Sequence, residues 1–257
     1  PLNEDGVTDI EILKENLDET VAGFYLQQPN YYGIIENAET FGNILHAVGG
    51  KFVTGVNPIS LGIIKTPAEY GADIAIGEGQ PLGMSLAFGG PYLGFMTCTA
   101  AMLRKMPGRI VGETTDVDGR RAYVLTLQAR EQHIRREKAS SNICSNQALC
   151  AMTAAVYMAA MGAEGLKNVA TQCISKAHDA AEKISALPGF ELRYKGAFFN
   201  EFVTECPYDM TLLQTRLEKE GILGGYPVEN NGILWCFTEM NTKEEIDNLV
   251  ELLGNIK

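Results

Sequence analysis

Short apolar runs and helix-like segments alternate along the first part of the chain. The apolar runs are rich in β-branched and aromatic residues, which favour strands, and the segments between them show helical spacing or end at glycine, which favours helices. Strands are predicted at residues 21–30, 51–57, 72–79 and 92–98, helices at 36–50 and 99–108, and two further strands across an Asp-Gly turn within 108–128. This alternation predicts βαβ units and a parallel sheet covered on both faces.

The pattern changes from about Ser145. Residues 145–162 are rich in alanine and methionine at helical spacing, with Ser145 as the expected N-cap and Gly162 as the terminator. Further helices are predicted at 163–189, 210–222 and 242–257, and strands at 190–194, 198–206 and 232–239. We therefore predict a large α/β domain over residues 1–160 and a smaller C-terminal α+β domain over 161–257.

The charge balance limits the class of partner. The 257 residues carry 21 lysines and arginines against 32 acidic residues, a net charge of −11. Nucleic acid and anionic membranes both require a basic surface, so neither is expected as a partner. No apolar run in the sequence approaches the roughly 20 residues of a membrane span, and the first residues are acidic without a signal-peptide core. We expect a cytoplasmic protein.

The metal-binding and redox residue types are sparse. None of the six cysteines forms a CxxC pair, and all lie in apolar or helical stretches, as buried reduced thiols do. The sequence has three histidines, which does not favour a histidine-rich metal site. We expect no metal centre.

Residues 74–95 combine a strand with a glycine-rich loop, IAIGEGQPLGMSLAFGGPYLGF. Glycines in such a loop allow backbone N–H groups to approach a phosphate closely. The spacing GEGQPLG matches neither GxGxxG nor GxxxxGK[ST], and no lysine follows it. Tight turns explain the same glycines, so phosphate binding and turn formation both stay open on spacing alone.

Several longer stretches resemble one known family. These are LQQPNYYGIIE (26–36), GADIAIGEGQPLGMSLAFGGPYLGFM (71–96) and MPGRIVGETTDVDGRRAYVLTLQAREQHIRREKASSNICSNQAL (106–149). They resemble subunit 1 of two-subunit glycine cleavage system P-proteins, the decarboxylating glycine dehydrogenases. The resemblance implies a type I, aspartate-aminotransferase-like fold of pyridoxal phosphate (PLP) enzymes, with a C-terminal small domain. It also implies that this chain is a C-terminal fragment with a partial large domain.

The resemblance includes a chemical departure. In PLP enzymes of this fold, a lysine on the loop after the strand at 72–79 carries the cofactor covalently, whereas Gln80 and Pro81 occupy that place here. Proline offers no amine, so no covalent PLP is expected on this chain. Lys65 is the lysine closest in sequence but is expected to point to solvent. The residue nearest the family's pyridine-binding acid is the neutral Asn57.

The resemblance implies a function as the non-catalytic half of a glycine decarboxylase. No catalytic residue is assigned to this chain; PLP is expected in the partner, P-protein subunit 2, with glycine as substrate and the lipoyl H-protein as acceptor. Gly89 and Gly90 are candidates for a backbone contact with the partner's cofactor phosphate, although they also explain a turn. The candidates for the substrate channel or subunit interface are Arg130, His133, Arg135 and Arg136.

Two other classes of function stay open. A self-contained PLP-dependent amino-acid decarboxylase requires a reactive lysine elsewhere in the chain. A pure scaffold subunit requires contact with neither cofactor nor substrate. The basic run 130–138 is also compatible with a solvated surface, and a lone histidine such as His133 is more often structural than a proton carrier.

Overall fold

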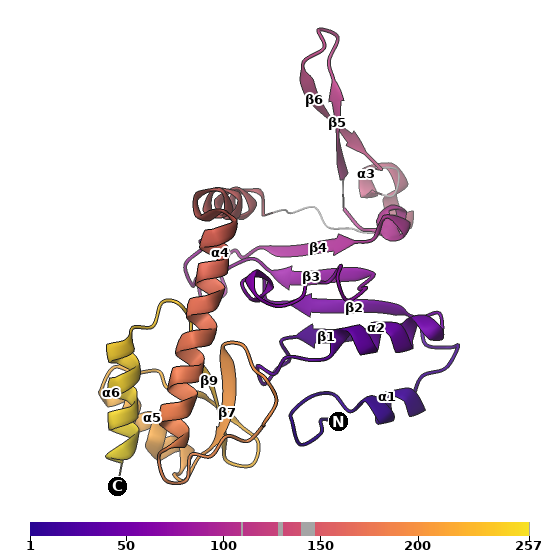
Figure 1. The fold of residues 1–257 in the computed structure, drawn as a ribbon. Coiled ribbons are helices and arrows are strands. Elements are labelled where there is room, and N and C mark those ends of the chain that lie inside the picture. Colours follow the sequence, from indigo (N-terminus) through magenta and orange to yellow (C-terminus); the bar gives the residue numbers. More distant parts are fainter. Residues whose placement is uncertain (109, 128–130, 140–146, 257) are drawn as a thin grey trace.

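The fold is that of a computed structural model, which describes residues 1–108, 110–127, 131–139 and 147–256. Figure 1 shows a four-stranded sheet with α2 beneath it, a two-stranded arm that rises from one end of β4, and a separate C-terminal unit joined by the long helix α4. The candidate site depends on how the sheet is built, and the arm and α4 determine which surfaces stay exposed.

The central sheet has the order β1-β2-β3-β4. The first three strands are parallel, and β4 pairs antiparallel with β3. Their bounds are Gly23–Gln28, Lys51–Val56, Ile74–Glu78 and Gly94–Cys98. All four strands fall where the apolar runs predicted them, and the prediction of parallel βαβ pairing is correct for the first three.

Helix α2 (Ala38–Ala47) covers one face of this sheet. Asn37 caps its first turn by accepting from the Thr40 amide, and the chain leaves the helix through Gly49 at φ +79°. Phe41 and Leu45 of α2 pack with Phe52 of β2 in a buried cluster. The short helix α1 (Ile10–Glu15), capped by Asp9 and absent from the sequence prediction, precedes β1.

The opposite face of the sheet is open among the described residues, so the prediction of cover on both faces is wrong for this chain. The aligned side chains of Tyr25, Gln27, Ile76 and Met96 point to this face. Tyr25 is 51% exposed and Met96 is 43% exposed. Parallel sheets are normally covered on both faces, and no described helix lies on this one.

Asp73, which precedes β3, anchors the sheet through three donors. Its carboxylate accepts from Lys51 Nζ at 2.9 Å, from the Phe52 amide at 3.0 Å and lies 2.8 Å from His46 Nε2. Burial alone would raise the pKa of Asp73, but these donors together lower it below the usual 3.8.

We expect Asp73→Asn to destabilise the protein in a pH-dependent way. A carboxyl whose pKa is lowered by folding stabilises fully above its ordinary value, and this contribution disappears as the pH falls through the lowered pKa. Urea denaturation of both proteins at pH 7 and at about pH 3 should therefore show a difference that shrinks at the acidic pH. A constant difference would contradict the ionic role of Asp73.

Strands β5 (Ile110–Thr115) and β6 (Arg121–Thr126) form a separate antiparallel hairpin, here called the arm. Asp116 accepts from the Asp118 and Arg120 amides at the turn, and Gly119 takes φ +75°, as the Asp-Gly prediction requires. The helix predicted at 99–108, before the arm, is a 3-10 helix over Ala100–Lys105, so the prediction was wrong about the type of helix. After the arm come α3 (Gln132–Arg135) and the 3-10 turn Arg136–Lys138.

Helix α4 runs from Ala148 to Ser185 and breaks at Gly162, where φ is 62° and ψ is −177°. Gly162, expected to end a helix, is therefore the site of a kink. The helices predicted at 145–162 and 163–189 form one kinked helix. The predicted N-cap Ser145 lies outside the described residues. By length and composition alone, this helix passes as a membrane span, with 6% of its most apolar window buried. The prediction that no apolar run approaches the roughly 20 residues of a membrane span is therefore not confirmed for this helix.

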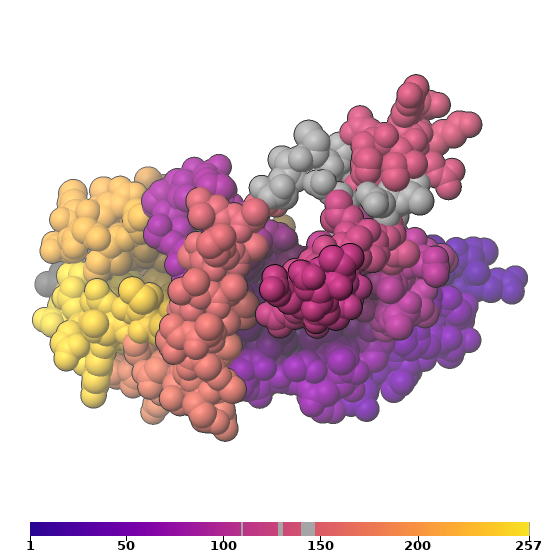
Figure 2. Space-filling view, turned by 90° about the horizontal axis from the view of Figure 1, so that it is seen from above, coloured from indigo at the N-terminus to yellow at the C-terminus, as the bar shows by residue number. Residues whose placement is uncertain are grey.

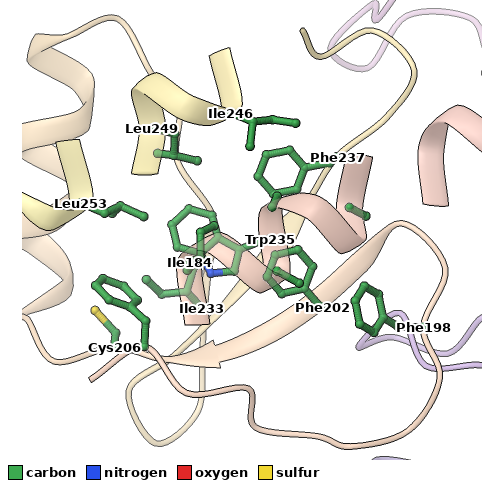
Figure 3. Close-up of a cluster of buried hydrophobic side chains, with 14 of the residues drawn as sticks. Ile184, Phe198, Phe202, Cys206, Ile233, Trp235, Phe237, Ile246, Leu249 and Leu253 are labelled. Atoms are coloured by element: carbon green, nitrogen blue, oxygen red, sulfur yellow. The ribbon is translucent and has the colours of Figure 1, made fainter. Parts of the chain in front are cut away.

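The C-terminal unit packs α5 (Met210–Lys219), α6 (Lys243–Gly254) and the second half of α4 against a sheet of order β7-β9-β8. Figure 3 shows its core, where Trp235, Phe202 and Phe237 meet Ile184 and the apolar side of α6. The strand bounds are β7 Glu201–Glu205, β8 Tyr226–Val228 and β9 Gly232–Cys236. The predicted strand at 190–194 is reduced to one bridge between Leu192 and Thr204.

Backbone bonds join the segment after β1 to this C-terminal unit. The Phe199 amide donates to the Gly33 carbonyl at 3.1 Å, and the Ile35 amide donates to the Ala197 carbonyl at 2.7 Å. Gly33, at φ +81°, lies so close to Glu201 that a Cβ would overlap the Glu201 carbonyl oxygen. The boundary near residue 160 stays a prediction, and these contacts show that the two parts also meet away from α4.

Candidate functional site

A cavity of about 710 Å³ lies where the three parallel strands end. In open α/β sheets, ligands bind outside the carboxyl ends of the strands. The residues after β2 and β3 contribute Asn57, Gln80 and Pro81, and the open sheet face contributes the floor. Other cavities occur, including one of about 420 Å³ beside Glu201 and Cys236 in the C-terminal unit, but this one occupies the position where the sheet topology favours a ligand.

The floor of the cavity is filled by side chains from β1. The Tyr25 hydroxyl donates to the Gln27 side-chain oxygen, and both groups lie over Gly55 of β2. A Cβ on Gly55 would overlap the Tyr25 hydroxyl. Gly55 is thus required by the close approach of these two side chains, which the sequence analysis did not identify.

The loop after β3 is held by hydrogen bonds within itself. Glu78 Oε1 accepts from the Gln80 amide at 3.0 Å and from the Leu93 amide at 2.7 Å. The Gln80 side chain donates to the Met84 carbonyl at 2.6 Å. The side chain at the place expected for a cofactor lysine is therefore engaged by the loop backbone, and the adjacent Pro81 has no donor.

Asn57 lines the cavity, and its side-chain oxygen accepts from the Ile59 amide at 3.0 Å. This bond shapes the turn that leads into the 3-10 helix Ser60–Gly62. An amide in this position supplies no negative charge. At the two positions where the resemblance implies a lysine and an acid, the cavity presents Gln80 with Pro81, and Asn57.

Lys65 lies away from the cavity. Its ammonium pairs with Glu39 of α2 at 2.7 Å, and its side chain is 66% exposed. The hydrogen bond to Glu39 raises the pKa of Lys65, which keeps the amine protonated. None of the lysines in the described part of the chain lines the cavity, so the residues present do not fit covalent PLP.

Gly89 and Gly90 form an exposed turn outside the cavity lining. Gly89 takes φ +96° with open space around it, and the Gly90 amide donates to the Ala87 carbonyl at 3.0 Å. The turn explanation accounts for both residues within this chain. A contact with a partner's phosphate stays a prediction, and the open space at Gly89 leaves room for one.

The structure does not bring the basic run into the cavity. His133 and Arg135 are exposed on α3, Arg136 takes φ +54° at the following turn, and Arg130 lies outside the described residues. Figure 1 places α3 beside the base of the arm. The run therefore belongs to the surface near the arm, and its role at an interface or channel stays a prediction.

The cysteines follow the prediction only in part. Cys173 and Cys206 are buried, Cys98 and Cys150 are half-buried, and Cys236 is exposed, so burial is wrong for Cys236. These five thiols are all free, and Cys144 is outside the described residues. No group of metal-ligating side chains occurs among the residues that the structure describes.

We expect Cys173 to react slowly with iodoacetamide. Burial, helped by the hydrogen bond to Glu239, raises the pKa of Cys173 to about 12, and its side chain is 2% exposed. The thiolate is the reactive form, so mass spectrometry should find Cys150 alkylated at pH 8 long before Cys173. Equal rates in the folded protein would contradict this environment.

The carboxylate of Glu36 was also missed by the sequence analysis. Glu36 is 4% exposed and accepts from the Thr8 amide, the Thr8 hydroxyl and the Asn30 side chain. This network fixes the Pro-Asn turn after β1 to the N-terminal segment. Its signal in the sequence was a single glutamate after an apolar pair, which does not distinguish a buried acceptor from a surface charge.

Solved structures place this architecture in a known class. The fold is similar to sphingosine-1-phosphate lyase from Burkholderia pseudomallei K96243, with a TM-score of 0.72 and 14% identity over 100% of this chain and 56% of that one. A NifS-like protein from Rickettsia africae matches with a TM-score of 0.69 and 14% identity over 99% of this chain and 68% of that one. At these identities the likeness concerns the fold alone, which is that of type I PLP-dependent enzymes, as the sequence predicted.

Closer relatives define the family. A family profile described as "Glycine cleavage system P-protein" matches residues 2–253. The chain is 51% identical over 98% of its length to "Probable glycine dehydrogenase (decarboxylating) subunit 1" of Moorella thermoacetica, and 49% identical over 99% to the protein of the same name in Desulfitobacterium hafniense. It therefore belongs to the glycine cleavage system P-protein family, as its motifs indicated.

A solved P-protein supports the same assignment. The crystal structure of glycine decarboxylase (P-protein) of the glycine cleavage system, in inhibitor-bound form, matches with a TM-score of 0.90 and 40% identity over 100% of this chain. The chain spans 57% of that protein and 58% of both curated relatives. The prediction of a partial large domain agrees with this coverage and with the open face of the sheet.

Proposed function

We propose that this chain acts as the non-catalytic subunit of a two-subunit glycine decarboxylase. The single observation that carries the proposal is the cavity at the carboxyl ends of β1–β3, where Gln80, Pro81 and Asn57 replace groups that would hold a cofactor. The relatives' name, subunit 1, implies a second subunit. We propose that this partner, subunit 2, binds PLP, and that the present chain binds none covalently.

The chemistry of the proposed complex is divided between the subunits. When bound to the partner, PLP supplies the electron sink for loss of CO2 from glycine. The lipoyl H-protein is the proposed acceptor of the remaining aminomethyl group. The present chain would complete the partner's fold, shape the entrance and exclude water. Its proposed compartment is the cytoplasm.

Mapping the cofactor tests the proposal. The complete subunit 1 is mixed with its cognate subunit 2 and PLP, reduced with borohydride and digested, and pyridoxyl peptides are located by mass spectrometry. We expect the adduct on subunit 2 alone and glycine–CO2 exchange only in the mixture with H-protein. A pyridoxyl adduct on any lysine of the present chain would favour the self-contained decarboxylase and overturn the proposal.

The proposed contacts in trans have a separate test. Gly89→Trp meets open space but places a side chain at φ +96°, so it should cost the isolated chain about 1–2 kcal/mol without unfolding it, which a urea denaturation of the variant checks. If Gly89 and Gly90 approach the partner's phosphate, the variant complex should still form but lose glycine–CO2 exchange. Full exchange would favour the pure scaffold.

The basic run is proposed to line the subunit interface or the substrate channel through Arg130, His133, Arg135 and Arg136. Arg136→Ala should then weaken the association of the two subunits or raise the KM for glycine.

A further inference from the structure

The arm exposes apolar side chains on both of its faces. Val111 pairs with Leu125, and Tyr123 pairs with Glu113, on one face, whereas Val124 lies on the other. Their exposed fractions are 56% for Val111, 43% for Leu125, 62% for Tyr123 and 50% for Val124. A hairpin that lies flat on its own domain would bury one of these faces, and this one buries neither.

The arm is also isolated from the rest of the described chain. Its two strands pack extensively on each other and make no extensive contact with any other described element. Figure 1 shows the arm rising beyond β4, and Figure 2 looks down on it from above. An isolated two-stranded hairpin is at best marginally stable in water. The arm therefore needs a covering surface to stay ordered.

The base of the arm differs in charge from the rest of the chain. The segments 104–109 and 127–138, which flank the arm, carry seven of the 21 lysines and arginines but only two of the 32 acidic residues, whereas the arm itself carries two arginines and three acidic residues. Arg121 lies over the Tyr123 ring at 5.8 Å, so a cation and an aromatic group are presented together on one face. Aromatic and arginine side chains are typical anchors at protein interfaces, and a basic surface favours an acidic partner surface.

A buried acceptor lies at the base of the arm. Glu131 precedes α3 and is 6% exposed, yet within the described structure no donor reaches its Oε1 atom. A buried carboxylate oxygen without a donor is costly. The chain's own atoms cover this oxygen, so the base of the arm would have to rearrange for a donor to reach it.

We propose that the arm inserts its apolar faces into a groove of the partner subunit, the PLP-binding subunit 2, that the basic base of the arm meets an acidic rim of this groove, and that the arm holds the two chains together. The inference rests on the proposed function for the identity of the partner. Together with α3 and the turn after it, the arm approaches the roughly 20–30 residues that each side of a standard interface contributes. Its two apolar faces match a groove, which covers both, better than a flat surface, which covers one.

The test compares variants of the complete subunit 1 in binding to subunit 2. The arm variant combines Tyr123→Ser with Leu125→Ser. The matched control combines Leu223→Ser with Met240→Ser, which are 91% and 79% exposed in the C-terminal unit. Isothermal titration should give a Kd at least about ten-fold higher for the arm variant, the loss of about 1.4 kcal/mol, and an unchanged Kd for the control. Arg121→Glu, which keeps the apolar faces, should also weaken binding, and salt should diminish its effect.

Three results would overturn the inference. The first is an arm variant that binds subunit 2 as the wild type does. The second is loss of self-association alone in sedimentation, which would assign the arm to a second copy of this chain. The third is a lower melting temperature of isolated subunit 1 with unchanged binding, which would assign the cover to the subunit's own polypeptide. Wild-type subunits that do not associate would refute the proposed function itself, so the two failures are distinguishable.

Discussion

Replacing Trp235 with alanine should lower the free energy of unfolding by about 3–5 kcal/mol. The indole of Trp235 is 2% exposed and lies at the centre of the C-terminal core, opposite Phe202 in the β7–β9 ladder. Its removal leaves a cavity between the sheet and the helices. It also leaves the Thr204 hydroxyl, which is fully buried and accepts from the indole N–H at 2.9 Å, without that donor.

Two further variants separate the causes of this loss. Trp235→Phe keeps most of the apolar volume and removes the N–H, so it should cost about 1–3 kcal/mol. Tyr226→Ala removes an aromatic ring that is 64% exposed on the neighbouring strand β8 and should stay within about 0.5 kcal/mol of the wild type. Urea denaturation is followed by far-UV circular dichroism, because Trp235 is the single tryptophan of the chain. Similar losses for Tyr226→Ala and Trp235→Ala would contradict the packing argument.

The sequence predicted the elements of the central sheet because local signals and tertiary structure agree there. Residues 51–57 are apolar and β-branched, and they lie in a buried parallel strand. The segment 190–194 mixes apolar and charged residues without a β-branched side chain, and along the free edge of β7 it makes one bridge, between Leu192 and Thr204. Strand pairing is decided by segments far apart in the sequence, which local propensity does not register. The short strand Tyr226–Val228 was missed because it holds a proline and pairs at an edge.

The sequence alone predicted that the candidate site has no cofactor lysine after β3. Proline at position 81 excludes an amine whatever the fold, so the sequence alone excluded a cofactor lysine there. The contents of the cavity were not predictable. Tyr25 and Gln27 are two residues apart on β1 and lie over a glycine of β2, a contact set by strand register.

Gly33→Ala is expected to lower the free energy of unfolding by roughly 2–5 kcal/mol. The residue takes φ +81°, which is unfavourable for alanine, and its new Cβ would overlap the Glu201 carbonyl oxygen at the start of β7. The same glycine accepts from the Phe199 amide, so any shift that relieves the overlap also separates the segment after β1 from the C-terminal unit. Urea denaturation measures the total loss in free energy of unfolding. Hydrogen exchange of the Phe199 amide measures how far the segment after β1 has separated from the C-terminal unit.

Gly49→Ala is the matched control, because Gly49 has nearly the same backbone conformation, φ +79°, and no atom lies within 4 Å of the point that an alanine Cβ would occupy. Gly49→Ala should lower the free energy of unfolding only by the cost of placing alanine in the left-handed backbone region, about 1–2 kcal/mol. Hydrogen exchange of the Phe199 amide should stay unchanged. The difference between the two variants then isolates the close approach of Gly33 to Glu201. Equal losses, with Phe199 equally protected in both, would mean that this contact does not couple the two parts of the chain, and that α4 and its kink at Gly162 carry the coupling instead.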